Sequence, residues 1–495
     1  MKACATLPAV TADRPPHSGP RSSGGAAPSI LTAEDLVRFT GGRLLRRSDR
    51  AILGAAVDSR AVRPGQLFVA LPGERTDGHE FITDALVNGA AAVVLTRPDV
   101  DPAALADATV IRVPDALRAL GAIAAGWRAR FDPLVVGVTG SVGKTSAKEA
   151  VAAVLGSAMA TLRTEGNQNN EIGLPLTLLR LGPEHQAAVL EMGMYATGDI
   201  ADLARIARPR IGVVTAVLGV HLSRIGSIAA VEKAKGELIE ALPSDGWAIL
   251  NHDDRRVRRM AGRTAARVLT YGFALDADVH AADVESAGFD GMRFTLRLRG
   301  AGGAMVRVPV GIPSLGRLSV HNALAGAAAG TAAGLSPEAI RVGLAAGWSA
   351  PHRGQLRRAG GVTIVDDAYN ASPASVAAAL ELLSGLPGRR VAVLGEMREL
   401  GRGSVAGHRE VGLAAATHCE WLFVVGDAAL GIAEGAIEAG MDRRRVIVVP
   451  DRDAALDALR ARLRDGDVVL VKASRGAELD RLVEAMVAEF GGSER

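Results

Sequence analysis

A glycine-rich segment near residue 140 carries the clearest chemical signal in the chain. It follows an apolar run at residues 134–138 and precedes a helix-like stretch at residues 146–155. Consecutive backbone N–H groups in such a segment can bind phosphate oxygens, and the N-terminus of the following helix favours their negative charge. The members of this segment are Gly140, Ser141, Val142, Gly143, Lys144, Thr145 and Ser146.

The residue types in this segment predict a bound ATP. The Lys144 ammonium can reach the β- and γ-phosphates, and the Thr145 hydroxyl can bind Mg²⁺. The common G-x-x-x-x-G-K-[ST] pattern fails by one position, because Val138 stands where its first glycine belongs. A glycine-rich turn without a ligand is the alternative. The coincidence of strand, loop, Lys144-Thr145 and helix favours the phosphate loop.

Polar side chains follow two further apolar runs. Glu191 comes directly after residues 187–190, and His221 follows residues 211–217. A carboxylate at the carboxyl end of a strand, in the sheet that carries a phosphate loop, is well placed to bind Mg²⁺. A lone histidine is more often structural, so position alone leaves the role of His221 open. Lys235, in Lys233-Ala-Lys235-Gly-Glu237, has the pattern of a solvated helix face.

Residues 164–175 are dense in amide side chains. The segment reads Thr164-Glu-Gly-Asn167-Gln-Asn169-Asn170-Glu-Ile-Gly-Leu-Pro175. An asparagine both donates and accepts hydrogen bonds, which suits sugar hydroxyls and diphosphate oxygens. An asparagine-rich turn is the alternative, since asparagine tolerates turn geometries.

Two N-terminal segments and one in the last third of the chain complete the set of motifs. Asp58-Ser59-Arg60 is followed by Asp77-Gly78-His79, and Asp366-Asp367-Ala-Tyr-Asn-Ala-Ser-Pro373 ends an apolar run. Together with the variant loop Gly140-Ser-Val-Gly-Lys-Thr145, these motifs resemble the Mur ligases, an amide-forming family similar to folylpolyglutamate synthases. The resemblance covers almost everything from residue 31 onward.

The resemblance implies a role for each motif. Uridine-nucleotide binding is implied for Ser59, Arg60, Asp77 and His79, and muramoyl-nucleotide binding for Thr164, Asn167 and Asn170. Mg²⁺ binding is implied for Thr145, Glu191, His221 and a carbamylated Lys235, which together with Lys144 form the catalytic set. ATP contacts are implied for Asn322 at the adenine, Asp367 at the ribose, and Arg353.

Two departures from the family pattern concern the ATP contacts. Gly316-Arg-Leu318 lacks a histidine that the family often has before the counterpart of Asn322. Pro351-His-Arg353-Gly354 stands where a Pro-Gly-Arg element is often found, which leaves the register of Arg353 open.

The activity implied by the resemblance is ATP-dependent amide formation through an acyl phosphate. Within the family, the motifs at residues 58–79 and 366–373 favour the enzymes that add D-alanyl-D-alanine to UDP-N-acetylmuramoyl-tripeptide. Another Mur ligase or a folylpolyglutamate synthase is the nearest alternative. A P-loop switch protein that binds nucleotide to control a partner is an alternative from another class.

Length and the order of apolar runs predict the architecture. The 495 residues suggest about three domains of roughly 100–200 residues each. We expect an α/β protein with a disordered extension at 1–29 and a first domain at 30–131, for which the resemblance implies UDP-sugar binding. A central P-loop-type parallel sheet follows at 132–346, and a Rossmann-like doubly wound sheet at 347–495. Thr32-Ala-Glu-Asp35 predicts a capping box at the first helix.

Composition excludes several classes of protein. Lys and Arg total 57 against 54 for Asp and Glu, without a basic run interleaved with aromatics, so we expect no nucleic-acid binding. The two cysteines form neither a disulfide framework nor a zinc pattern, which suits a reducing cytosol. No apolar stretch is long enough to span a bilayer. We therefore expect a cytoplasmic protein without membrane insertion. We also take it to be a monomer, which the composition itself does not determine.

Overall fold

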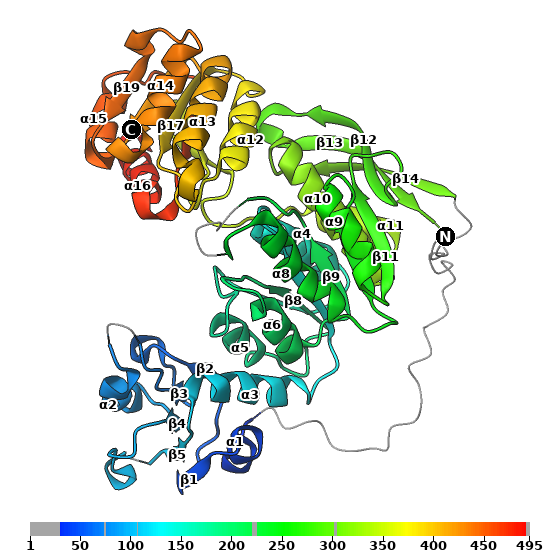
Figure 1. Ribbon diagram of the computed structural model, residues 1–495, viewed down its shortest axis with the longest axis vertical. Coiled ribbons are helices and arrows are strands. Elements are labelled where there is room, and N and C mark those ends of the chain that lie inside the picture. The colour runs from blue at the N-terminus through cyan, green and yellow to red at the C-terminus, as the bar shows by residue number, and fades with distance from the viewer. Residues whose placement is uncertain (1–29, 74–75, 106, 220–224, 301–303, 492–495) are drawn as a thin grey trace.

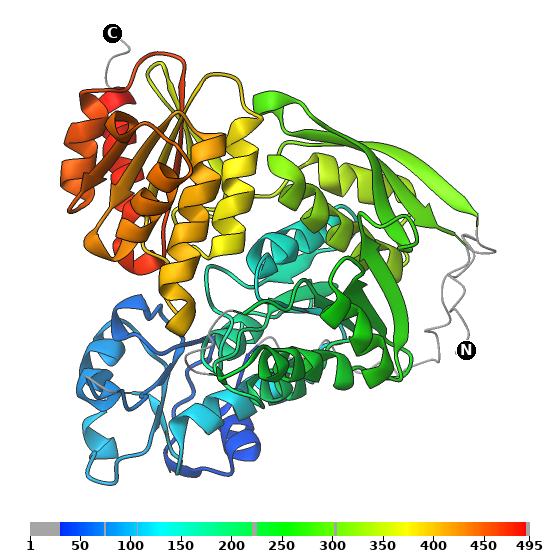
Figure 2. The ribbon, with the colours of Figure 1, turned by 45° about the horizontal axis from the view of Figure 1, so that its top comes forward.

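The computed structural model describes residues 30–491, except 74–75, 106, 220–224 and 301–303. The predicted extension at 1–29 lies outside this part of the chain, as does His221. The described residues form three sheets in chain order, which confirms the expected α/β architecture. Each sheet and its helices form one unit of the fold. In both views the first and last units lie on the same side of the central unit, and the strands at residues 279–312 lie on the opposite side (Figures 1 and 2).

The first sheet has five strands in the order β1-β5-β4-β3-β2, with β1 antiparallel and the others parallel. The capping box at α1 is present, because Thr32 and Asp35 each accept a hydrogen bond from the other's backbone N–H. The elements are α1 Ala33–Thr40, β1 Arg43–Arg46, β2 Ala55–Ala56, β3 Leu67–Val69, α2 Ile82–Val87, β4 Ala92–Leu95, β5 Thr109–Arg112 and α3 Ala116–Arg128.

The central sheet has nine strands in the order β14-β13-β12-β11-β10-β9-β6-β8-β7. The strands from β7 to β12 run parallel, whereas β12, β13 and β14 form an antiparallel meander that the sequence analysis did not predict. The first half comprises β6 Leu134–Thr139, α4 Lys144–Gly156, β7 Thr161–Arg163, α5 Gly173–Leu178, β8 Ala187–Glu191, α6 Asp199–Ala207, β9 Ile211–Val214 and α8 Ile228–Glu240. The second half comprises β10 Trp247–Asn251, α9 Arg255–Arg259, β11 Arg267–Gly272, β12 Val279–Ser286, β13 Met292–Arg299, β14 Met305–Ile312, α10 Gly316–Ala332 and α11 Pro337–Ala345.

The last sheet has six strands in the order β15-β16-β20-β17-β18-β19, with only the edge strand β15 antiparallel. Helices separate its parallel strands, as expected of a doubly wound sheet. The elements are β15 Gln355–Ala359, β16 Val362–Asp366, α12 Pro373–Ser384, β17 Arg389–Gly395, α13 Ser404–His418, β18 Trp421–Val425, α14 Leu430–Glu438, β19 Val446–Val449, α15 Arg452–Arg460, β20 Asp467–Lys472 and α16 Leu479–Phe490.

Helix α3 connects the first unit to the central one. Its apolar face joins a buried cluster that includes side chains of α5 and α6. The Trp127 indole donates a hydrogen bond to the Leu181 carbonyl at 2.9 Å, and the Arg128 guanidinium donates to the Ala207 carbonyl at 2.9 Å. These contacts fix the first unit on the central sheet. Among the described residues, no helix is long and apolar enough to cross a membrane.

Candidate active site

The glycine-rich loop joins β6 to α4, as the sequence predicted. Gly140 has a φ of +153° and Gly143 a φ of +81°, both in the region that favours glycine. A Cβ on Gly140 would lie 1.8 Å from the Thr215 hydroxyl oxygen. The backbone N–H of Ser141 donates to the Ala216 carbonyl at 2.7 Å. The loop is therefore held against the end of β9, and only glycine fits at position 140.

Lys144 is the first residue of α4, a helix whose N-terminus carries no side-chain cap. The uncapped N–H groups and the helix dipole favour an anion at this point. The Lys144 Nζ donates to the Gly140 carbonyl at 2.8 Å, which bends the ammonium back over the loop. Burial lowers the pKa of Lys144, the nearby Glu191 opposes this shift, and the nearby Arg353 adds to it. The three charged side chains thus converge on the phosphate loop.

Glu191 lies at the carboxyl end of β8, beside the loop, and is 2% exposed. One carboxylate oxygen accepts a hydrogen bond from Asn169 Nδ2 at 2.7 Å. The other, Oε2, is buried and has no hydrogen-bond partner among the described residues. A buried carboxylate oxygen without a partner is costly unless a cation or donor completes it. This geometry fits a metal ligand.

Lys235 lies on α8 and is 2% exposed. The interpretation of residues 233–237 as a solvated helix face is therefore wrong: Lys233 is exposed, but Lys235 and Glu237 point inward. Burial, together with the neighbouring Lys144 charge, holds the pKa of Lys235 well below the usual lysine value. Glu237 accepts hydrogen bonds from the backbone N–H groups of Gly198 and Ala201, so the inward face of α8 packs on α6.

The asparagine-rich loop turns its members in different directions. Thr164 is fully buried, and its hydroxyl accepts the backbone N–H of Glu191 at 3.1 Å, so it positions Glu191 from within. Asn170 Oδ1 accepts the backbone N–H of Gly173 at 2.9 Å, where α5 begins. Asn167 is exposed at the tip of the loop. Among the described residues, Thr164 and Asn170 use their side-chain oxygens within the protein, whereas the exposed Asn167 side chain makes no hydrogen bond there.

The predicted uridine-binding residues lie in the first unit. Ser59 is buried, and the exposed Arg60 pairs with Asp58 at 2.7 Å and lowers the pKa of Asp58. His79 is buried, and its two ring nitrogens contact Asp77 Oδ1 at 2.5 Å and the backbone N–H of Thr96 at 3.0 Å. In this conformation the His79 ring connects two chain segments and has no nitrogen left for a ligand.

The predicted ATP contacts come from two units: Asn322 belongs to the central unit, and Arg353 and Asp367 belong to the last unit. The Asn322 side chain, on α10, lies 3.3 Å from the position that a Cβ on Gly143 would take. The Arg353 guanidinium lies 4.1 Å from the centre of the Tyr369 ring. Asp367 Oδ2 accepts a hydrogen bond from the buried Lys472 at 2.6 Å.

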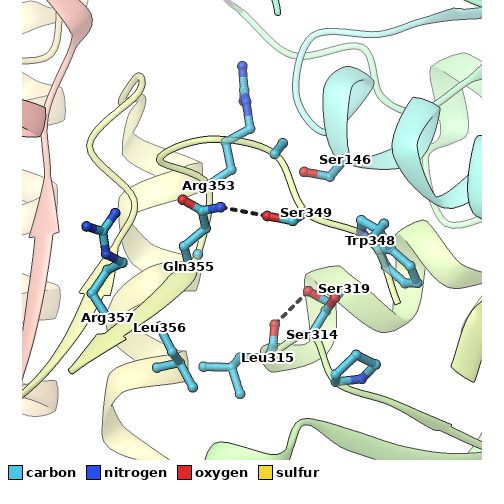
Figure 3. A pocket seen from close by; sticks show the side chains of 13 residues that line it. Ser146, Ser314, Leu315, Ser319, Trp348, Ser349, Arg353, Gln355, Leu356 and Arg357 are labelled. Atoms are coloured by element: carbon cyan, nitrogen blue, oxygen red, sulfur yellow. Dashed lines mark hydrogen bonds between the residues drawn. The ribbon is translucent and has the colours of Figure 1, made fainter. Parts of the chain in front are cut away.

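A cavity of about 320 Å³ opens between the start of α4, the N-terminal end of α10 and the linker before β15. Figure 3 shows Ser146 and Arg353 on its rim, with Ser314, Leu315 and Ser319 across from them. Four serines supply hydroxyl groups to the lining, and Trp348 supplies an aromatic ring. The remaining lining residues are Pro313, Trp348, Ser349, Ala350, Gly354, Gln355, Leu356 and Arg357.

Comparisons with known proteins agree with the three units of the fold. Family models described as "Mur ligase family, catalytic domain", "Mur ligase middle domain" and "Mur ligase, glutamate ligase domain" match residues 52–128, 138–330 and 352–475. A curated UDP-N-acetylmuramoyl-tripeptide–D-alanyl-D-alanine ligase of Mycobacterium tuberculosis is 38% identical, over 93% of this chain and 98% of its own. The Escherichia coli protein of the same name is 36% identical, over 92% and 98%.

The chain belongs to the Mur ligase family.

Solved structures of Mur ligases share the fold over nearly the whole chain. A MurF of Acinetobacter baumannii is 28% identical and has a TM-score of 0.82, covering 93% of this chain and 100% of its own. A MurF ligase of Thermotoga maritima, in complex with ADP, is 30% identical with a TM-score of 0.77, covering 89% and 98%. A folylpolyglutamate synthase of Mycobacterium tuberculosis is 19% identical with a TM-score of 0.58, covering 74% and 94%, and shares the fold alone.

The site of this Mur ligase includes residues to which the sequence analysis gave no role. Asn169 holds Glu191, and Lys472 holds Asp367. A signal existed for both: Asn169 belongs to the asparagine-rich segment, and Lys472 ends an apolar run, as Glu191 does. Lys148 had no such signal. It is fully buried on α4, pairs with Glu149 and donates to the Thr164 carbonyl at 2.7 Å.

Proposed function

We propose that this Mur ligase adds D-alanyl-D-alanine to UDP-N-acetylmuramoyl-tripeptide in peptidoglycan precursor synthesis, consuming ATP. The observation that carries this assignment is the 36–38% identity, over nearly full length, to curated enzymes that bear this name. The phosphate loop with its converging charges supports the use of ATP. Because ATP is a cytoplasmic co-substrate, we place the reaction in the cytoplasm.

The first step activates the terminal carboxylate of the tripeptide. A carboxylate oxygen attacks the γ-phosphorus of ATP, an acyl phosphate forms, and ADP leaves. The loop N–H groups and Lys144 hold the β- and γ-phosphates and offset the charge that develops on them. The Arg353 charge, which acts on Lys144 in this structure, would offset the phosphate charge further.

The second step forms the amide. The neutral amine of D-alanyl-D-alanine attacks the acyl carbon, its nitrogen loses one proton, and the tetrahedral intermediate expels phosphate with the former carboxylate oxygen attached. An acyl phosphate is also attacked by water, so the ATP and the peptide must meet in a closed site. The placement of the phosphate loop next to the linker of the last unit supports such a closure.

We propose Mg²⁺ as the metal, because it prefers oxygen ligands and Glu191 and Thr145 both offer oxygens near the phosphate loop. No group of three or more His, Cys, Asp or Glu side chains gathers as a metal site among the described residues. Glu191 offers a buried oxygen without a partner, and the Thr145 hydroxyl lies at the start of α4. We propose Thr145, Glu191, His221 and a carbamylated Lys235 as ligands. When bound, Mg²⁺ neutralises phosphate charge.

The lowered pKa of Lys235 supports its carbamylation. Carbon dioxide reacts with the neutral amine, and the carbamate forms with release of a proton. An uncharged amine is favoured at this position because burial and the Lys144 charge both disfavour the ammonium. The carbamate would present two oxygens, which Mg²⁺ prefers as ligands.

The ATP would extend from the phosphate loop into the cavity beside α10. Asn322 lies against Gly143, which supports a contact with the adenine or its neighbouring atoms. Asp367, held by Lys472, supports the ribose contact. Asn167 and Arg60 are exposed, so they are accessible to the UDP-linked peptide.

Phosphate release, measured with and without each substrate, tests this function against its alternatives. We expect release only when ATP, the tripeptide nucleotide and D-alanyl-D-alanine are all present. Turnover with a single amino acid in place of the dipeptide indicates another Mur ligase, and turnover with a folate indicates a folylpolyglutamate synthase. ATP hydrolysis that is indifferent to peptide indicates a nucleotide switch and contradicts the proposal.

A further inference from the structure

His352 lies in the linker that joins α11 to β15, next to Arg353, and has a φ of +56°. A residue with a Cβ adopts this left-handed conformation only where the surrounding contacts hold it. Three contacts do so. The backbone N–H of His352 donates to Gln355 Oε1 at 3.2 Å, its carbonyl accepts the Tyr369 N–H at 3.1 Å, and its ring contacts Asp366 at 2.8 Å.

The ring contact has a defined direction. Asp366 is fully buried at the end of β16, and its Oδ2 lies 2.8 Å from His352 Nδ1. Burial raises the pKa of Asp366, and the hydrogen bond with His352 opposes this rise. An ionised carboxylate only accepts hydrogen bonds, so we assign the proton to His352 Nδ1 as the donor. The other carboxylate oxygen accepts the Ala368 N–H at 3.3 Å. Without the His352 ring, Asp366 Oδ2 would lose the only side-chain donor that reaches it among the described residues.

The turn at His352 determines where Arg353 points. Tyr369 follows Asp366 and Asp367 in the chain, and its backbone N–H donates to the His352 carbonyl. Arg353 lies over this ring at 4.1 Å, and its charge reaches Lys144. The linker is braced again by Gln355, whose Nε2 donates to the Ser349 hydroxyl at 2.6 Å (Figure 3). His352 therefore connects the end of β16 with the arginine that faces the phosphate loop.

We propose that His352 is a positioning residue for Arg353: its ring, hydrogen-bonded to Asp366, holds the linker in the left-handed turn that directs the guanidinium over Tyr369 and toward the phosphate loop. This inference rests on the proposed contact of Arg353 with ATP. The side chain of His352 contacts no substrate in this account and acts through the linker.

Three substitutions separate the ring contact from the backbone conformation. His352→Ala removes the ring and keeps a Cβ at positive φ, whereas His352→Gly removes the ring and relieves the backbone. His352→Asn tolerates the left-handed conformation and places its amide Nδ2 near the position of the imidazole Nδ1, so it can donate to Asp366. His280→Ala is the matched control, because His280 is buried on β12 and its Nδ1 contacts the Ala277 carbonyl at 3.0 Å, far in the chain from Arg353.

The readout is the affinity of the full chain for a non-hydrolysable ATP analogue, with the KM for ATP and for the tripeptide nucleotide measured beside it. We expect the Ala and Gly variants to bind the analogue about tenfold or more weakly. Without the ring contact Arg353 is no longer held in place, and its hydrogen bond to a charged phosphate of the analogue is lost. The Asn variant should bind within about threefold of wild type, and the KM for the tripeptide nucleotide should not change. His280→Ala should lower the melting temperature and leave the affinity for the analogue unchanged.

Two results would overturn the proposal. One is wild-type affinity in both the Ala and the Gly variant. The other is an equal loss in the Ala, Gly and Asn variants, which would leave the ring contact without a role. Binding of the analogue does not require ligation, so a wild-type chain that binds ATP but fails to join the dipeptide contradicts the proposed function and leaves this inference standing on its own result.

Discussion

Replacing Gly140 by alanine should damage the phosphate loop without touching a catalytic side chain. The added Cβ would lie 1.8 Å from the Thr215 hydroxyl oxygen and 3.1 Å from the Ala216 backbone nitrogen. The Thr215 hydroxyl cannot simply rotate away, because it donates to the Val142 carbonyl at 2.6 Å inside the same loop. Either the loop or the end of β9 must move.

The size of the effect follows from two contributions. Backbone strain at a φ of +153° costs about 1–3 kcal/mol for a residue with a Cβ. Forcing an extra methyl group into a packed site costs about 1–3 kcal/mol more. If the loop escapes the clash by leaving its phosphate-binding conformation, a total of about 2–6 kcal/mol corresponds to at least a roughly 30-fold loss in kcat/KM for ATP.

The assay is phosphate release at varied ATP, with thermal melting as the check on folding. Gly156→Ala is the matched control, since Gly156 ends the same helix and no heavy atom lies within 4 Å of the added Cβ. This variant should keep wild-type kinetics and gain up to about 1 kcal/mol of helix stability. The reasoning is refuted if Gly140→Ala stays within about threefold of wild type in kcat/KM for ATP.

Three further substitutions test other parts of the account. Lys144→Ala should abolish ligation and leave the melting curve in place, because its charge serves phosphates; wild-type turnover would contradict the loop assignment. Lys235→Ala should lose on the order of 10²-fold in activity. Added short carboxylic acids should restore part of that activity by supplying the missing carbamate oxygens. Full activity without them would show that Lys235 has only a structural role. Asp467→Ala should lower the free energy of unfolding, followed in urea, by about 1–3 kcal/mol, because the partly exposed Arg389 loses the buried carboxylate that binds it at 2.6 Å. A loss under about 0.5 kcal/mol would show that pair to be dispensable.

Many of the parallel strands were predictable because they are short apolar runs followed by helical segments, whereas β7, β10 and β11 were not predicted. β6, β8 and β9 lie where those runs do, and so do β16 to β20. The meander β12–β14 was not predicted, although Met292–Arg299 alternates apolar and polar residues with the period of a half-buried strand. The segment contains no continuous apolar run, which is the feature that identified the parallel strands.

The phosphate loop was predictable because glycine is the residue type that its backbone geometry requires. The glycines at 140 and 143 are required by backbone geometry, and the phosphate loop lies where the spacing placed it. The orientation of polar side chains was not predictable. His79 and Thr164 point into their own units because local donors and acceptors satisfy them there. Lys235 points inward because residues on α8 at its helical spacing, such as Val231 and Leu238, belong to the buried face.

The central claim is that the peptide carboxylate is activated as an acyl phosphate in the site built around Lys144 and Glu191. It is tested most directly with tripeptide nucleotide labelled with ¹⁸O in its terminal carboxylate, in the presence of ATP and D-alanyl-D-alanine. Since the attacking carboxylate oxygen leaves with the phosphoryl group, the account predicts one ¹⁸O in each phosphate released, measured by mass spectrometry, for each amide formed. Phosphate that carries no label, while the amide still forms, would contradict it.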